Sequence, residues 1–158
     1  MPQSARYRSV LLCVAFFACI AARSAPSDVA TLWAIYSNAS NEAYSRHAVL
    51  EPDGTTFISS GDIDMEWLRD SSAVLDAYVP QAATKPAIRS MLRGALARQA
   101  RYIIIDPYAN AFMEDYQVAE RKFEVDSLLY PIRLAYHYWR MTGDASIFTP
   151  EQQRAFAL

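Results

Sequence analysis

The stretch TKPAIRSMLRGALARQARYIIID, residues 84–106, decides the class of the fold. Its apolar residues recur three or four positions apart, the spacing that puts side chains on one face of an α-helix. Pro86 suits the first turn of a helix, and Asp106-Pro107 marks its end, because the residue before a proline disfavours helical backbone. The stretch therefore predicts a long helix whose buried face consists of Ile88, Met91, Leu92, Ala95, Leu96, Tyr102 and Ile103.

Helical spacing continues on both sides of this stretch. Residues 29–50 predict one helix or two short ones, and residues 67–79 predict a further helix that Pro80 ends. Residues 128–139 return to helical spacing, and Gly143 follows as a stop signal at the C-terminal end. The face of this helix that we predict to be buried consists of Leu128, Leu129, Ile132, Ala135, Tyr136 and Trp139.

Two segments have the pattern of extended chain. Pro52-Asp53-Gly54 predicts a turn, and residues 55–59 have the β-branched content of a short strand. In residues 121–126 the side chains alternate between two sides, which is the period of extended chain rather than of a helix. The chain is therefore predicted to be mainly α, with short extended segments. The charged residues on one side of the second segment are Lys122, Glu124 and Asp126.

The N-terminal residues have the layout of a secretory signal peptide. Two arginines precede an apolar run over residues 10–22, and Ala22-Arg23-Ser24 offers a cleavage site. We therefore expect residues 1–24 to be removed and the product to be exported to the periplasm or the medium. One alternative is an uncleaved membrane anchor, but the apolar run is shorter than the roughly 20 residues that span a bilayer. Another is a lipoprotein modified at Cys19.

Composition excludes several classes of function. A formal net charge of −2 offers no field that would attract nucleic acid. With four glycines the chain has no glycine-rich phosphate loop and no GxSxG turn, and His47 and His137 stand far apart without cysteine neighbours. We therefore predict no metal, no cofactor and no nucleic-acid partner. A basic stripe at helical spacing is predicted to be a solvated helix face; it comprises Arg89, Arg93, Arg98 and Arg101.

Three polar segments stand at the ends of the predicted helices. They are GDIDMEWLRDS at residues 61–71, DPYANAF at residues 106–112 and ERKFEVDSLLYP at residues 120–131. Loops held by a rigid scaffold often carry binding and catalytic residues. All three segments are therefore candidates for the functional site.

The first segment has the side-chain types that bind sugars. Asp62 and Asp70 are ionised acceptors, and Arg69 is a fork of fixed donors. Trp67 offers a flat apolar face on which the C–H groups of a sugar ring can stack. The structural alternative is that Asp70 caps the following helix while Arg69 forms a surface ion pair with Glu66 or Asp62.

The other two segments add an amide and further carboxylates. Asn110 is a compact donor and acceptor, and Glu124 and Asp126 are acceptors on one side of the extended segment. The alternatives are a plain loop that ends a helix, a solvated strand edge, and a capping role for Asp126. A further alternative is a purely structural ion-pair network of Glu120 and Glu124 with Arg121 and Lys122.

Taken in order and at this spacing, the segments resemble a known family. GDIDMEWLRDS, RYIIIDPYANAF and ERKFEVDSLLYPIRLAYHYW closely resemble the N-terminal half of glycoside hydrolase family 125, the metal-independent exo-α-1,6-mannosidases. The resemblance extends over residues 55–144. It departs from the family at Asp64-Met65-Glu66, where relatives usually read proline, alanine and methionine before the tryptophan.

This resemblance implies a partial (α/α)6 toroid, in which residues 25–158 are the N-terminal part of a truncated catalytic domain. It implies an inverting exo-α-1,6-mannosidase that releases terminal mannose from α-mannosides or N-glycans, with a general acid and a general base beyond Leu158. We therefore expect this chain alone to be inactive. The alternative is a non-catalytic carbohydrate-binding or interaction module. The residues expected to bind the α-mannoside are Asp62, Trp67, Arg69, Asp70, Asn110, Glu124 and Asp126.

The C-terminal residues also favour truncation. Thr149-Pro150-Glu151-Gln152 is a capping box that predicts the start of a helix, and only a few residues follow it. Such a short helix is unstable in water unless it packs against a partner.

Overall fold

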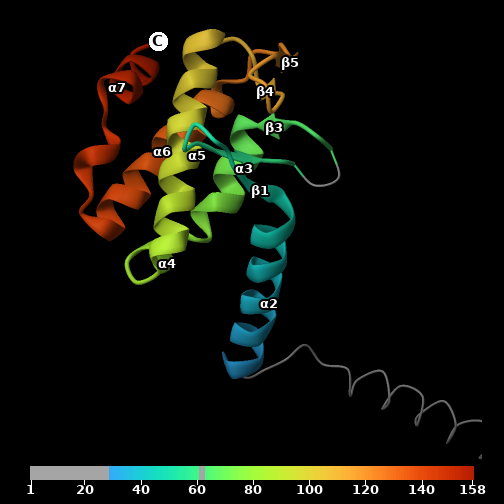
Figure 1. Ribbon diagram of the computed structural model, residues 1–158, viewed down its shortest axis with the longest axis vertical. Helices are drawn as coiled ribbons and strands as arrows, with labels where there is room; N and C mark the ends of the chain where they lie inside the picture. Colours follow the sequence, from blue (N-terminus) through green and yellow to red (C-terminus); the bar gives the residue numbers. More distant parts are fainter. Residues whose placement is uncertain (1–28, 61–62) are drawn as a thin grey trace, which may run out of the picture. The chain divides into compact units, whose positions relative to one another are not determined.

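The computed structural model describes residues 29–60 and 63–158. Residues 29–39 belong to one compact unit, and residues 40–158 form a larger one. The described chain is mainly helical, as the sequence predicts (Figure 1). None of its described helices is both long enough and apolar enough to cross a membrane. The predicted signal peptide lies outside the described residues.

Helix α2 (Val29–His47) is a single helix that leads into a β-hairpin. Strand β1 (Ala48–Leu50) pairs antiparallel with β2 (Thr56–Ile58), which confirms the predicted turn and strand. The turn places Gly54 at a φ of 80°, a backbone conformation that glycine adopts without steric cost. The predicted helix over residues 29–50 ends earlier than expected, because its last three residues pair with β2 instead.

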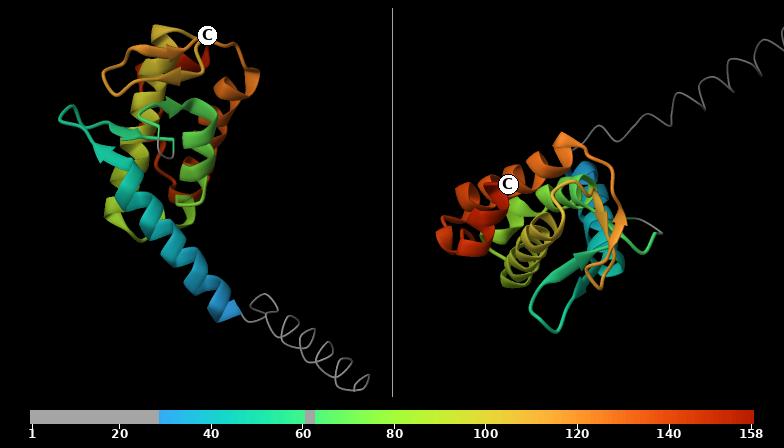
Figure 2. Two further views of the ribbon diagram at one scale, coloured as in Figure 1. Left: turned by 90° about the vertical axis from the view of Figure 1, so that its right-hand side faces the viewer. Right: turned by 90° about the horizontal axis from the view of Figure 1, so that it is seen from above.

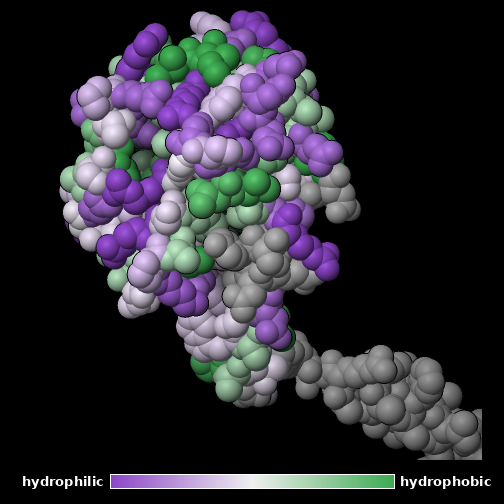
Figure 3. Space-filling view, viewed as in Figure 1, coloured by the Kyte–Doolittle hydropathy of each residue, from purple (hydrophilic) through white to green (hydrophobic). Residues whose placement is uncertain are grey.

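Helix α5 (Pro86–Ile105) confirms the prediction made from residues 84–106. All seven residues of the predicted face are buried. Helix α3 (Leu68–Asp76), helix α4 (Val79–Ala82) and helix α6 (Val125–Thr142) contribute to the same core. Figure 2 shows these helices from two further sides. On the face drawn in Figure 3, hydrophobic residues form separate patches among hydrophilic ones.

Pro80 does not end the helix that precedes it. Helix α3 ends at Asp76, and Pro80 stands in the first turn of α4. Proline is tolerated there because the first amides of a helix have no partner within the helix. The prediction of one helix over residues 67–79 was therefore wrong in its boundaries.

A small antiparallel sheet has the strand order β3–β4–β5. Strand β3 (Glu66–Trp67) pairs with β4 (Ala111–Phe112), which pairs with β5 (Val118–Glu120). The chain ends with a short 3-10 turn, η1 (Ala145–Ile147), and helix α7 (Pro150–Phe156), which packs against α5. Thr149 caps α7 as predicted, since its Oγ1 accepts from the amide of Gln152 at 3.1 Å. The return bond of a capping box is replaced, because the amide of Thr149 donates to the carbonyl of Ile147.

The face of α6 that the sequence predicts as buried is corrected. Leu129 and Tyr136 are 54% and 52% exposed, because this helix is apolar on more than one side. The predicted extended segment also stops earlier, since α6 already begins at Val125 and places Asp126 in its first turn. Gly143 ends the helix at a φ of 70°, as predicted. The residues of α6 that are buried are Ser127, Pro131, Leu134, Ala135 and Tyr138.

Arg98 does not lie on a solvated helix face. Its side chain is 1% exposed, whereas Arg93 on the same helix is exposed as predicted. The Arg98 guanidinium donates to the hydroxyls of Tyr102 and Thr55 at 2.6 and 3.0 Å. Its Nε lies 4.0 Å from Oε2 of Glu66, which is also fully buried. The basic stripe thus includes one buried cation, which joins α5 to Thr55 just before β2 and to Glu66 in β3.

Gly94 allows α5 to touch the hairpin closely. A Cβ atom at this position would stand 2.4 Å from Oγ1 of Thr56, 2.9 Å from its amide nitrogen and 3.0 Å from the carbonyl oxygen of Gly54. Two of these atoms belong to the backbone, so the clash cannot be relieved by a rotamer change alone.

We expect Gly94→Ala to lower the free energy of unfolding by about 1–3 kcal/mol, because overpacking outweighs the better helix propensity of alanine. Urea unfolding followed by circular dichroism measures the change. The matched control is Ala97→Gly on the same helix, for which a loss of about 0.5–1 kcal/mol is expected from propensity. An unchanged or raised stability of Gly94→Ala would contradict the close contact.

Candidate functional site

The small sheet brings the three polar segments together. Strand β3 comes from the first segment, β4 from the second and β5 ends at the start of the third. The amide of Leu68 donates to the carbonyl of Asn110 at 3.1 Å, and the amide of Asn110 donates to the carbonyl of Glu120 at 3.1 Å. In Figure 1 the three strands lie beside one another at one end of α5. Segments that are far apart in sequence therefore share one end of the molecule.

Glu120 joins two of the predicted sugar-binding residues. Its Oε2 accepts hydrogen bonds from Nε1 of Trp67 at 3.1 Å and from Nδ2 of Asn110 at 2.6 Å. These bonds, the one from Trp67 first, hold the pKa of the Glu120 carboxyl below its usual range. Asn110 is buried, and its Oδ1 accepts from the amide of Lys122 at 3.1 Å. The indole ring and the amide group are thus fixed by an ionised carboxylate.

Arg69 is the centre of a second cluster. Its Nη1 lies 3.1 Å from Oδ2 of Asp126 and 3.7 Å from Oε2 of Glu124, and its Nε lies 3.2 Å from Oδ1 of Asp70. On the other oxygen of Glu124, Nζ of Lys122 pairs at 2.8 Å. Helix α3 contributes Arg69 and Asp70 from its first turn, and the start of α6 contributes the other two carboxylates. Three carboxylates and two cations therefore surround one partly exposed spot.

The structure tests the capping and ion-pair alternatives that the sequence left open. Asp70 does not cap α3, since it lies inside the first turn and Trp67 occupies the cap position without a side-chain bond. Asp126 likewise lies in the first turn of α6 and does not cap it. Arg69 does form ion pairs, with Asp70 in its own segment and with Glu124 and Asp126 in the third segment, but not with Glu66. Asp62 lies outside the described residues.

Two residues of the site were not among those the sequence predicts to bind sugar. Glu120 and Lys122 were both assigned to a possible structural ion-pair network with Arg121 and Glu124, and Lys122 was also placed on one side of an extended segment. The alternation over residues 121–126 pointed to Lys122 and Glu124, which do form a pair. No sequence signal places Glu120 beside Trp67, because that contact depends on the pairing of β4 with β5.

The carboxylates of the site are not suited to donate a proton. The pKa of Glu124 is held below its usual range, first by Lys122, and that of Glu120 is lowered as well. Both are thus ionised at neutral pH and have no proton to give. Glu66 has a raised pKa but is fully buried, so a substrate cannot reach it. Among the described residues, no group of three or more His, Cys, Asp or Glu is arranged to hold a metal ion.

Comparison with known proteins identifies the family. The family model described as metal-independent alpha-mannosidase (GH125) matches residues 28–158. This chain belongs to glycoside hydrolase family 125. The GH125 chain is also similar to the meiotically up-regulated gene 157 protein of Schizosaccharomyces pombe, with 34% identity over 125 residues, covering 65% of this chain and 25% of the yeast protein.

A solved structure supports the fold of this GH125 chain. It is a metal-independent alpha-mannosidase of Streptococcus pneumoniae in a non-productive complex with α-1,6-mannobiose. The match has a TM-score of 0.74 and 33% identity, and it covers 77% of this chain and 32% of the pneumococcal chain. The predicted fold class, part of the α/α toroid of this family, is confirmed. The GH125 chain thus spans about a third or less of the length of these two relatives.

Proposed function

We propose that this chain supplies the sugar-binding part of the active site of an inverting exo-α-1,6-mannosidase. The observation that carries the proposal is the cluster around Arg69, in which two cations and three carboxylates lie within ion-pair distance at the shared end of the three segments. A sugar hydroxyl both donates and accepts hydrogen bonds, so a terminal mannose can replace some of these ion pairs with charge-assisted hydrogen bonds. Trp67 adds an aromatic face for the ring.

The general acid and the general base are proposed to come from residues outside this chain. An inverting enzyme needs a protonated carboxyl on one side of the bond and a carboxylate that activates water on the other. The accessible carboxylates of Glu120 and Glu124 are held in the ionised form by hydrogen bonds, which favours binding and the stabilisation of positive charge. Their role would be to orient the mannose and stabilise its oxocarbenium-like transition state.

Binding of α-1,6-mannobiose to the purified chain tests the proposal. Isothermal titration calorimetry is expected to show weak binding, which Arg69→Met weakens by about tenfold to a hundredfold, because a hydrogen bond to a charged group contributes about 1.5–3 kcal/mol. The chain is also expected to release no mannose from the disaccharide.

The matched control is Arg133→Met, which removes an exposed arginine that pairs with Asp76 through an Nη2–Oδ2 contact of 2.7 Å. This variant is expected to bind the disaccharide as the unaltered chain does. Turnover of the disaccharide by the chain alone would overturn the assignment of acid and base to other residues. Equal binding by the Arg69 and Arg133 variants would overturn the assigned sugar site.

A further inference from the structure

Glu66 stands in β3, immediately before the residues of the proposed sugar site. Trp67 follows it in the same strand and occupies the cap position of α3, whose first turn carries Arg69 and Asp70. The strand is only two residues long, and both residues pair with β4. Because the backbone is continuous, a displacement of Glu66 moves Trp67 and the first turn of α3 with it.

The Glu66 side chain is buried in the core and has few hydrogen bonds. It is 0% exposed, and its Oε2 accepts from the amide of Ile58 in β2 at 3.1 Å. Its other oxygen, Oε1, has no hydrogen bond within the described part of the chain. A neutral carboxyl is far better tolerated in such a place than a carboxylate, because burial penalises the charged form.

Arg98 lies near Glu66 but does not donate a hydrogen bond to it. Its Nε is 4.0 Å from Oε2 of Glu66, whereas its guanidinium nitrogens donate to Tyr102, Thr55 and the carbonyl of Glu114. Burial therefore raises the pKa of Glu66 to about 7, against the opposing effects of its hydrogen bonds and of the nearby cation. The carboxyl thus changes its charge close to neutral pH.

The other groups around Glu66 keep their charge in this range. Arg98 stays protonated, and Tyr116, in the turn after β4, packs its ring on that guanidinium. Burial holds the pKa of Tyr102 on α5 well above its usual range, so this phenol stays neutral. From α3, α5 and β2, Glu66 also meets neutral groups in the described part of the chain, namely the Ser71 hydroxyl, the Gln99 amide and the Ile58 backbone amide.

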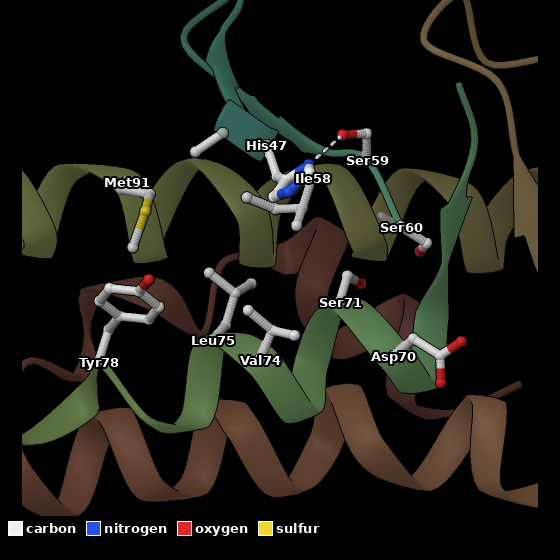
Figure 4. Close-up of a pocket in the computed structure, with 11 residues that line it drawn as sticks. His47, Ile58, Ser59, Ser60, Asp70, Ser71, Val74, Leu75, Tyr78 and Met91 are labelled. Atoms are coloured by element: carbon white, nitrogen blue, oxygen red, sulfur yellow. Dashed lines mark hydrogen bonds between the residues drawn. The ribbon is translucent and has the colours of Figure 1, made fainter. Parts of the chain in front are cut away.

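A cavity of about 420 Å³ gives the first turn of α3 room to move (Figure 4). Figure 4 shows Ser71 and Val74 of α3 on one side of it, and Ile58 and His47 on the other. Asp70 also lines this cavity. Close-packed side chains resist displacement because they leave no free volume, and on this side α3 is not closely packed.

We propose that Glu66 is a positioning residue of the sugar site: its neutral carboxyl keeps Trp67 and the first turn of α3 in place, and its ionisation displaces them so that mannosides are released. The proposal rests on the proposed function, since it requires mannose to be bound at Trp67 and Arg69. The family resemblance places methionine at position 66. The response to pH is therefore a property of this chain that relatives with methionine lack.

The affinity of the purified chain for α-1,6-mannobiose, measured by calorimetry, is expected to fall about threefold to tenfold between pH 6 and pH 8. About tenfold is the limit that applies if only the neutral form of Glu66 binds. Glu66→Gln is expected to bind equally well at both pH values, because glutamine is neutral and keeps an oxygen for the Ile58 amide. Any effect of His47 is common to the unaltered chain and this variant.

The matched control is Glu151→Gln, which removes an exposed glutamate of α7 that lies 3.6 Å from Nε of Arg101. This variant is expected to lose affinity between pH 6 and pH 8 as the unaltered chain does. Glu66→Met carries the residue that the family resemblance places there, and its affinity is expected to be as independent of pH as that of Glu66→Gln.

The indole group of Trp67 reports the displacement without any sugar. Its Nε1–H donates to Glu120 at 3.1 Å, so a shift of β3 changes the chemical shift of this group in a nitrogen–proton NMR spectrum. Trp67→Phe assigns the signal. In the unaltered chain the signal is expected to move with a midpoint near pH 7, and in Glu66→Gln it is expected to stay in place.

The outcomes separate the two proposals. Mannobiose binding that is equal at pH 6 and pH 8, or that falls equally in Glu66→Gln, overturns this inference and leaves the sugar site standing. A Trp67 signal that moves equally in the unaltered chain and in Glu66→Gln overturns the displacement. Absence of binding at every pH overturns the proposed function, whatever the Trp67 signal does. If Glu66→Gln does not fold, Glu66→Met takes its place in each comparison.

Discussion

Replacing Arg98 with methionine is expected to lower the free energy of unfolding by about 3–5 kcal/mol at pH 8, because it leaves the ionised carboxylate of Glu66 buried without its cation. The same change removes the donors to Tyr102, Thr55 and the carbonyl of Glu114. It also removes the guanidinium from its place 4.3 Å from the centre of the Tyr116 ring. Urea unfolding followed by circular dichroism measures the loss.

Two comparisons make this prediction specific. Arg93→Met on the same helix removes an exposed cation that pairs with Asp144, and a loss of at most about 1 kcal/mol is expected. The double variant Glu66→Met with Arg98→Met is expected to recover much of the lost stability, because a buried ion pair is often no better than apolar residues of similar volume. Methionine is also the residue that the family resemblance places at position 66. Losses of equal size in the Arg93 and Arg98 variants would show that Arg98 is not a buried partner of Glu66.

The stability of the chain is expected to fall by about 3 kcal/mol between pH 4.5 and pH 8 through Glu66 alone. Burial raises the pKa of this carboxyl to about 7, against the opposing effects of the Ile58 amide and of the nearby Arg98. In the unfolded chain the group titrates near its ordinary value of 4.5. The folded state therefore retains a proton that the unfolded state has lost. Its contribution is complete below pH 4.5 and disappears as the pH rises through 7.

Glu66→Gln isolates this effect, since glutamine has no charge at any pH and keeps an oxygen that can accept from the Ile58 amide. The unfolding free energies of the unaltered chain and of this variant are measured in urea from pH 4.5 to 8. The unaltered chain is expected to lose about 3 kcal/mol relative to the variant over this range. Effects of pH on groups other than residue 66 cancel in the difference. A difference that stays constant over this range would contradict the raised pKa.

At more acidic pH, other carboxylates change the stability of the folded state in the opposite direction. Hydrogen bonds from Thr55 lower the pKa of Asp53, and those from Ser146 lower the pKa of Asp144. Carboxylates of this kind stabilise the folded state above about pH 4 and lose their contribution as the pH falls further. The pH range used for Glu66 lies above this loss, so the two effects do not overlap.

Helical periodicity predicted α5 well and α6 poorly, for a physical reason. The face of α5 has one apolar stripe, so the spacing of Ile88, Met91 and Leu96 suffices to identify it. Helix α6 carries apolar residues on more than one side, and the stripe through Leu129 and Tyr136 satisfies the same spacing as the one that is buried. Only the neighbours of α6 decide which stripe enters the core.

Within the candidate site, the sequence identified the residue types but not their partners. Arg69, Asp126 and Glu124 were predicted as separate candidates in two segments, and the structure brings them into one cluster. The sheet that joins the segments has strands of two or three residues, which are too short to leave a periodic signal. For the same reason the bond between Glu120 and Trp67 could not be foreseen.

The sequence by itself determined the mainly helical class, the buried face of α5 and the family of the chain, because these depend on spacing and order along one chain. The tertiary structure alone decided the burial of Arg98, the partners of Arg69 and the cavity beside Asp70. A charged residue at a helical position has the same local sequence whether it faces water or a buried carboxylate. The difference lies in the energy of desolvation, which depends on what packs against it.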